Sequence, residues 1–102
     1  MTNPIIKEVF MMNTKDMLPI GSVVMMKNGK KPLMIIGYCQ KDSANPDTTY
    51  DYSGVFFPEG NIGPKYQFLF NHSDIVKIFH LGLDSKERFD FIDKLKAFDQ
   101  KK

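Results

Sequence analysis

Cysteine is almost absent from this 102-residue chain, since Cys39 stands alone. A single cysteine excludes an internal disulfide, so a reducing cytoplasm is the simplest location for the protein. The first residues, MTNPIIKEVFMMNTKDML, lack both the basic start and the long apolar run of a secretory signal or a membrane segment. We therefore expect a cytoplasmic protein that does not use a membrane as its partner.

An excess of charge of one sign is also missing. The chain has 14 basic and 12 acidic residues, which leaves a net charge of +2, and the two signs are interspersed. Such a chain creates no long-range field that would make nucleic acid the obvious partner. Lys27, Lys30 and Lys31 next to aromatic segments leave a small-barrel nucleic-acid-binding protein as an alternative, although lysines at turns also protect sheets from aggregation.

Recognisable catalytic motifs are missing too, including a phosphate-binding glycine loop, G-x-S-x-G and H-E-x-x-H. Cys39, His72 and Asn71 are the residue types of a cysteine-nucleophile site, but no local signature accompanies them. One cysteine together with His72 and His80 does not give the ligand spacing of a zinc site. We expect a protein that is not an enzyme and that uses no cofactor and no metal.

What the sequence does contain is an apolar hairpin within LPIGSVVMMKNGKKPLMIIG, residues 18–37. Two apolar runs, Val23–Met26 and Leu33–Ile36, flank Asn28-Gly29, a dipeptide that favours a turn in which both central residues have positive φ. Both faces of each run are apolar, so we expect a second layer to cover the face that points away from the core.

Further strands are predicted over residues 50–57, 66–70 and 75–81, where aromatic and β-branched residues accumulate. The polar residues 41–49 are typical of a loop, and residues 71–74 are typical of a single helical or Asx turn. In that turn we expect the Asn71 side chain to accept a backbone hydrogen bond.

Two helices are predicted, one at each end of the chain. Asn3-Pro4 and the apolar spacing that follows predict a short helix over about residues 4–12. Asp84, three residues before Glu87, has the spacing of a capping box, and it predicts a helix that ends near residue 98. Its apolar side, which we expect to pack on the sheet, consists of Phe91, Ile92, Leu95 and Phe98, with Phe89 at the margin.

These elements predict an α+β fold, a small bent antiparallel sheet or SH3-like half-barrel of about five strands with a C-terminal helix and a short N-terminal helix. Residues 1–102 form a single domain in this interpretation. Residues 1–17 provide the N-terminal helix and connector, 18–83 the sheet and 84–98 the final helix.

The segments LPIGSVVMMKNGKKPLMIIG, YDYSGVFFPEGNIG and YQFLFNHSDIVKIFHLG, followed by a short helix with FIDKL, resemble a family of small proteins of unknown-function designation. Members of that family are encoded beside LXG-domain toxins in type VII secretion loci of Firmicutes, and some are called Lcp-type targeting factors or chaperones. The resemblance covers about residues 18–95.

The resemblance implies a non-enzymatic cytoplasmic adaptor or chaperone that binds a cognate LXG toxin for export, together with a small WXG-like helical partner. Long helical toxins of that class expose apolar seams, and a sheet that carries aromatic and methionine side chains can cover one. We expect such protein-binding contacts among aromatic residues and one histidine, namely Tyr50, Tyr52, Phe56, Phe57, Tyr66 and His72. For each aromatic residue, packing in the core is the competing interpretation.

An immunity protein that neutralises a secreted toxin is the second interpretation from another functional class. An adaptor should bind the N-terminal LXG helices, whereas an immunity protein should bind the C-terminal toxic domain.

Overall fold

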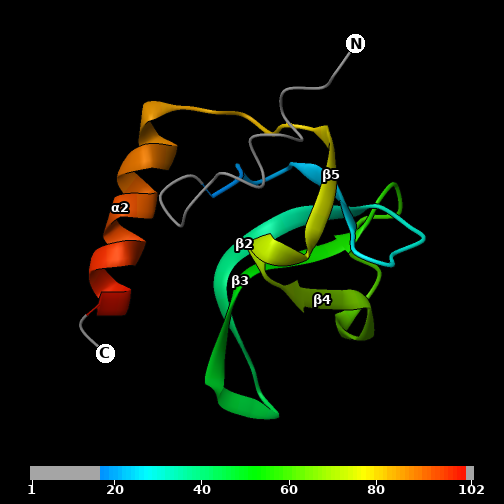
Figure 1. Ribbon diagram of the computed structural model, residues 1–102, viewed down its shortest axis with the longest axis horizontal. Helices are drawn as coiled ribbons and strands as arrows, with labels where there is room; N and C mark the ends of the chain where they lie inside the picture. The colour runs from blue at the N-terminus through cyan, green and yellow to red at the C-terminus, as the bar shows by residue number, and fades with distance from the viewer. Residues whose placement is uncertain (1–16, 101–102) are drawn as a thin grey trace.

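The computed structural model describes residues 17–100 as one antiparallel sheet with a C-terminal helix (Figure 1). The predicted helix over residues 4–12 lies outside the described residues. The elements in chain order are β1 (Val23–Met26), β2 (Leu33–Asp42), β3 (Asn45–Phe56), the 3₁₀ helix η2 (Pro64–Tyr66), β4 (Gln67–Phe70), the 3₁₀ helix η3 (His72–Asp74), β5 (Ile75–His80) and α2 (Lys86–Gln100).

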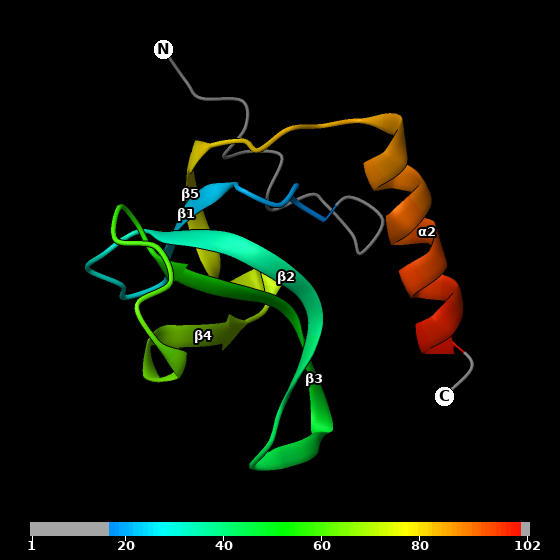
Figure 2. The same ribbon diagram turned by 180° about the vertical axis from the view of Figure 1, so that it is seen from behind.

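The five strands have the order β4-β3-β2-β1-β5, and all neighbours are antiparallel. β2 and β3 are long and strongly curved, and their shared ribbon projects from the rest of the sheet (Figures 1 and 2). Ile36 is an extra residue in β2, because Ile35 lies opposite Gly54 whereas Gly37 lies opposite Ser53. Such a bulge bends a strand. The α+β class and the bent five-stranded sheet are thereby confirmed.

The core lies on one face of this bent sheet and includes the segment that leads into β1. Leu18, Ile35 and Tyr52 have no exposed surface. Gly54 lets β4 approach closely, since a Cβ at this position would lie 2.9 Å from the Phe70 ring. The other buried apolar residues of the cluster are Met17, Val24, Leu33, Tyr38, Phe70, Ile75, Ile78 and Ile92.

The β1–β2 hairpin is confirmed, but its predicted turn is wrong. Val23 pairs with Met34 and Val24 with Leu33, so the loop spans residues 27–32. The Gly29 N–H donates to the Met26 carbonyl over 2.8 Å, and only Asn28 has positive φ, at 62°. β1 pairs with β2 only as far as Val24, whereas it pairs with β5 along its whole length.

The predicted loop over residues 41–49 is also wrong, because the β2–β3 ladder continues through most of it. Lys41 lies opposite Thr49, and Asp42 pairs with Asn45. The Asp42 carboxylate accepts the Ala44 N–H over 3.0 Å and so closes the tight turn. The ladder pairs Lys41, Asp42, Asn45 and Thr49 within this segment, and the threonines before Tyr50 favour extended backbone.

β5 contains two irregularities where it pairs with β1. Val24 faces Ile78 and Val23 faces His80, which leaves Phe79 as an extra residue; Val76 is the extra residue between Lys77 and Ile75. This arrangement explains why every third residue of β5 is buried instead of every second. Bulges also disfavour pairing of an edge strand with another chain.

α2 begins two residues later than predicted, and its cap is Ser85. The Ser85 hydroxyl accepts the Arg88 N–H over 3.2 Å, whereas Asp84 forms an ion pair with the Arg88 guanidinium at 2.7 Å. That guanidinium also donates to the Met17 carbonyl over 2.7 Å, which ties the helix to the segment before β1.

Only part of the predicted apolar side of α2 packs against the core. Ile92 is buried and Leu95 is partly buried, but Phe89 and Phe91 remain about half exposed. The Phe98 side chain lies outside the described part of the structure.

No helix within residues 17–100 has both the length and the hydropathy needed to cross a membrane.

The linker between β5 and α2 crosses the segment before β1 at Gly82, which gives a first prediction. A Cβ at Gly82 would lie 2.0 Å from the Ile20 carbonyl oxygen. We expect Gly82→Ala to lower the free energy of unfolding by about 2 kcal/mol or more, because backbone must move to admit the methyl group. Urea unfolding measures this change. Leu83→Ala, at the next and exposed position, is the control, and equal losses for both variants would contradict the close crossing.

The left-handed residue of the β1–β2 loop gives a second prediction. Asn28 has φ of 62°, a conformation that costs most L-residues about 1–2 kcal/mol and costs glycine little. We expect Asn28→Val to lower the melting temperature and Asn28→Gly to leave it unchanged or raised. Thermal unfolding followed by circular dichroism distinguishes the two. Equal melting temperatures for both variants would show that this position is not held in the left-handed conformation.

Candidate protein-binding site

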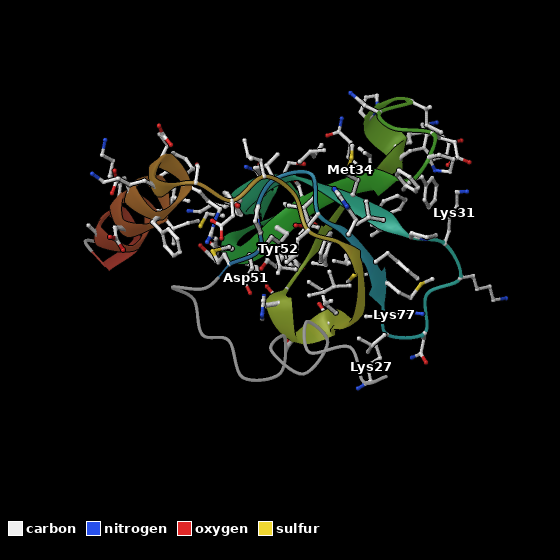
Figure 3. All side chains as sticks on the ribbon, turned by 90° about the horizontal axis from the view of Figure 1, so that it is seen from above. Lys27, Lys31, Met34, Asp51, Tyr52 and Lys77 are labelled. Atoms are coloured by element: carbon white, nitrogen blue, oxygen red, sulfur yellow. The ribbon has the colours of Figure 1, made fainter. Side chains whose placement is uncertain are left out.

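Tyr52, one of the predicted contact residues, lies in the interior of the sheet (Figure 3). Its hydroxyl accepts the Leu18 N–H over 3.0 Å and lies 2.6 Å from Nδ1 of His72. Because the phenol oxygen already accepts a hydrogen bond, we assign its proton to the bond with Nδ1. Tyr52 therefore packs in the core, which was the competing interpretation, and it has no exposed surface that a partner could contact.

A second buried tyrosine holds the same segment. The Tyr38 hydroxyl donates to the Leu18 carbonyl, so Leu18 has both backbone groups bonded to tyrosine hydroxyls of the sheet. The two rings lie 6.1 Å apart. Burial raises the pKa of both hydroxyls above the ordinary value, more strongly for Tyr52.

His72 is half-buried at the start of η3, where hydrogen bonds join it to β3. Its backbone N–H donates to the Asp51 carboxylate over 2.9 Å, and the Asp51 N–H donates to the Asn71 side chain over 3.1 Å. The Asn71 side chain thus accepts a backbone hydrogen bond as expected, and the donor comes from the neighbouring strand. The arrangement fixes the turn between β4 and β5.

The other predicted contact residues lie on β3 and around the loop between β3 and β4. Phe56 is half-buried and contacts the Phe68 ring at 4.8 Å and the Tyr66 ring at 6.3 Å. Phe57 and Tyr66 are exposed, and Tyr50 is half-buried on the β2–β3 ribbon. The structure therefore brings Phe56 and Tyr66 together but does not gather all six residues on one surface.

A different surface, the α2–β2 groove, lies where the first turns of α2 face β2. It is an open groove of about 480 Å³ with mostly apolar walls. The segment before β1, the bulge of β2, the linker after β5 and the start of α2 all contribute. Its lining residues are Ile20, Ile36, Gly37, Tyr38, Gln40, Leu83, Ser85, Glu87, Arg88 and Phe91.

Four large apolar side chains of this groove are exposed to solvent. Leu83 is 86% exposed, Phe91 50%, Ile20 47% and Ile36 38%. Two of the polar side chains at the groove are engaged within the protein, since the Gln40 amide donates to the Tyr38 carbonyl over 2.8 Å and Arg88 binds Met17 and Asp84. A groove with several exposed apolar side chains and few polar ones is suited to binding another polypeptide.

Sequence reasoning missed most of this groove. Ile20 and Leu83 belong to connecting segments, and they become neighbours only because the linker crosses at Gly82. Ile36 lies in a run that the alternation pattern predicts to be covered, but the bulge turns it outward. The two leucines that flank Gly82, Leu81 and Leu83, were the available signal, since linkers are usually polar.

The residue types of a cysteine-nucleophile site do not line this groove, since neither Cys39 nor His72 contributes to it. Cys39 has φ of 50° in β2. Within residues 17–100, no group of His, Cys, Asp and Glu side chains is arranged to hold a metal ion.

The raised pKa of the buried tyrosines gives a third prediction. Above about pH 10 the unfolded chain releases phenolic protons that the folded chain retains, so the free energy of unfolding should fall as pH rises, by up to about 1.4 kcal/mol per pH unit for each such tyrosine. Urea unfolding from neutral pH upward measures the slope.

Tyr52→Phe should be less stable at neutral pH by about 1–3 kcal/mol, because the Leu18 N–H loses its acceptor. Above pH 10 its stability should fall less steeply than that of the unmodified chain. Tyr66→Phe, which changes an exposed tyrosine, is the matched control. A Tyr52→Phe slope equal to that of the unmodified chain would contradict the assignment.

Comparison with known proteins gives one family. No curated protein and no solved structure matches the chain. The family described as "Domain of unknown function (DUF4176)" matches residues 17–91, which include all five strands, the linker and the start of α2. All residues that line the α2–β2 groove fall within the match. The chain belongs to the DUF4176 family.

Proposed function

We propose that this protein is a non-enzymatic cytoplasmic adaptor that binds a cognate LXG-domain toxin for type VII secretion. The proposal takes the partner from the resemblance of residues 18–95 to proteins encoded beside such toxins. The proposal locates the contact at the α2–β2 groove and not at the aromatic residues and His72 that were expected from the sequence. A small WXG-like helical protein completes the complex in this proposal.

We choose this surface because four large apolar side chains are exposed around one groove, namely Leu83, Ile20, Ile36 and Phe91. A helix that binds in such a groove inserts apolar side chains spaced by three or four residues. The N-terminal LXG helices, which expose apolar seams, have this character. The groove wall is held firmly, because Arg88 fixes α2 to Met17 and the tyrosine hydroxyls fix Leu18.

The fourth prediction is that the chain forms a complex with the N-terminal LXG region of its neighbouring toxin and that Leu83→Asp weakens it about ten-fold or more. Leu83 is the suitable position because its exposed side chain contributes little to folding. Co-purification followed by titration calorimetry measures the affinity.

Ile62→Asp is the matched control, since Ile62 is an exposed apolar residue that does not line the groove. Thermal unfolding of both variants checks that the fold is retained. Absence of a complex with the N-terminal region, with or without the small helical partner, would contradict the adaptor function. Binding to the C-terminal toxic domain instead would favour an immunity protein.

A further inference from the structure

A second apolar groove, the phenylalanine groove, lies between the β1–β2 loop and strands β3 and β4. Its volume is about 440 Å³. It shares no lining residue with the α2–β2 groove. The lining residues are Met26, Gly29, Lys30, Lys31, Leu33, Phe56, Phe68, Leu69 and Phe70.

The floor of the phenylalanine groove is aromatic and only partly covered. The Phe56 and Phe68 rings contact each other at 4.8 Å, and both side chains are half-buried, as is Leu69. Phe70 is buried beneath them. The groove therefore has room for a large apolar side chain from outside and offers ring edges as contacts.

The rim of this groove is cationic. Lys31 lies 6.0 Å above the centre of the Phe56 ring and forms an ion pair with Glu59 at 2.9 Å. The hydrogen bond from Lys31 lowers the pKa of the Glu59 carboxyl, so this group is ionised at neutral pH. Lys30 is exposed and forms no ion pair with any residue between 17 and 100. One rim lysine thus already holds a carboxylate, and the next carries an unmatched charge.

Further cations surround the same end of the molecule. Lys27 and Lys77 lie with Lys31 at the end opposite α2 (Figure 3). Lys27 and Lys77 are exposed, and the Lys77 ammonium lies 4.8 Å from the centre of the Phe79 ring. The chain as a whole carries only +2, so this concentration of positive charge is local. Charge complementarity therefore favours an anionic occupant for the nearby groove.

The neighbouring edges of the sheet indicate how that occupant binds. β5 is interrupted by two bulges, and β4 is short and lies between two 3₁₀ helices. Both features disfavour the addition of a strand from another chain. Recognition at this end therefore depends on side chains, with an apolar group in the groove and charges at the rim.

We propose that the phenylalanine groove is a second docking site, which binds a polypeptide segment that carries a large apolar side chain next to carboxylates. The apolar side chain packs against Phe56 and Phe68, and a carboxylate pairs with Lys30. Glu59 competes with the segment for Lys31. The site does not depend on the proposed toxin groove, because the two surfaces share no lining residue.

A polypeptide fits this groove better than single-stranded nucleic acid. Sequence-independent binding of single strands needs open ring faces along a cationic channel. Phe56 and Phe68 cover each other and pack against the core, so their faces do not form such a platform. Glu59 at the rim also repels phosphates.

The fifth prediction tests this site with short random peptides displayed on phage, selected against the full chain. The enriched sequences should combine Asp or Glu with Leu, Ile, Phe or Met. A synthetic peptide of the enriched sequence, labelled for fluorescence anisotropy, should bind more weakly as salt is raised. Lys30→Glu should weaken its binding about five-fold, and Glu59→Gln should strengthen it about two-fold, because Lys31 is released.

Lys86→Glu is the matched control, since it makes the same charge change at an exposed lysine on α2. Leu83→Asp should leave peptide binding unchanged, which separates this site from the α2–β2 groove. Leu69→Ala tests the apolar wall and should also weaken binding, with thermal unfolding as a check on the fold.

The proposal is overturned if no sequence is enriched, if enriched sequences lack acidic residues, or if Lys30→Glu and Lys86→Glu weaken binding equally. Titration with a labelled poly(dT) oligonucleotide tests the alternative that the groove binds single-stranded nucleic acid. Tight binding of that oligonucleotide, lost in Lys30→Glu, would assign the groove to nucleic acid instead. None of these measurements uses the toxin, so their outcome does not depend on whether the proposed adaptor function is correct.

Discussion

The attachment of Leu18 to two buried tyrosine hydroxyls is the interaction on which the rest of the fold depends. Tyr52 accepts its N–H and Tyr38 binds its carbonyl, so an irregular segment enters the core without unsatisfied backbone groups. Leu18 fills the space that a bent sheet of five strands leaves open. Because Met17 is held by Arg88, the same segment also determines where α2 lies.

The sequence predicts the number of strands and, apart from the ends of β2 and β3 within residues 41–49, their approximate positions in the chain, because their apolar runs are separated by turn-forming residues. It does not predict how far β1 pairs with each of its two neighbours, β2 and β5. Asn28-Gly29 favours a tight hairpin locally, but β1 and β2 stop pairing after Val24, whereas β1 pairs with β5 over its whole length. That pairing joins residues far apart in the chain, and local turn preferences contain no information about it.

The candidate site is harder to predict than the fold for a related reason. The aromatic residues chosen from the sequence include Tyr52, which is fully buried, and Tyr66, which is exposed, and alternation along a strand does not distinguish them. Ile36 and Leu83 become surface features through a bulge and a crossing of connecting segments. Both events depend on tertiary packing, which the periodicity of a single strand or linker does not encode.

The crossing at Gly82 links regions that are distant in sequence. Its N–H donates to the Ser22 hydroxyl across 60 positions, and Arg88 reaches Met17 across 71 positions. Closing such long stretches of chain has a large entropic cost, so contacts of this kind are expected late in folding. The α2–β2 groove is built from these same segments, so a newly made chain would acquire this surface only as folding is completed.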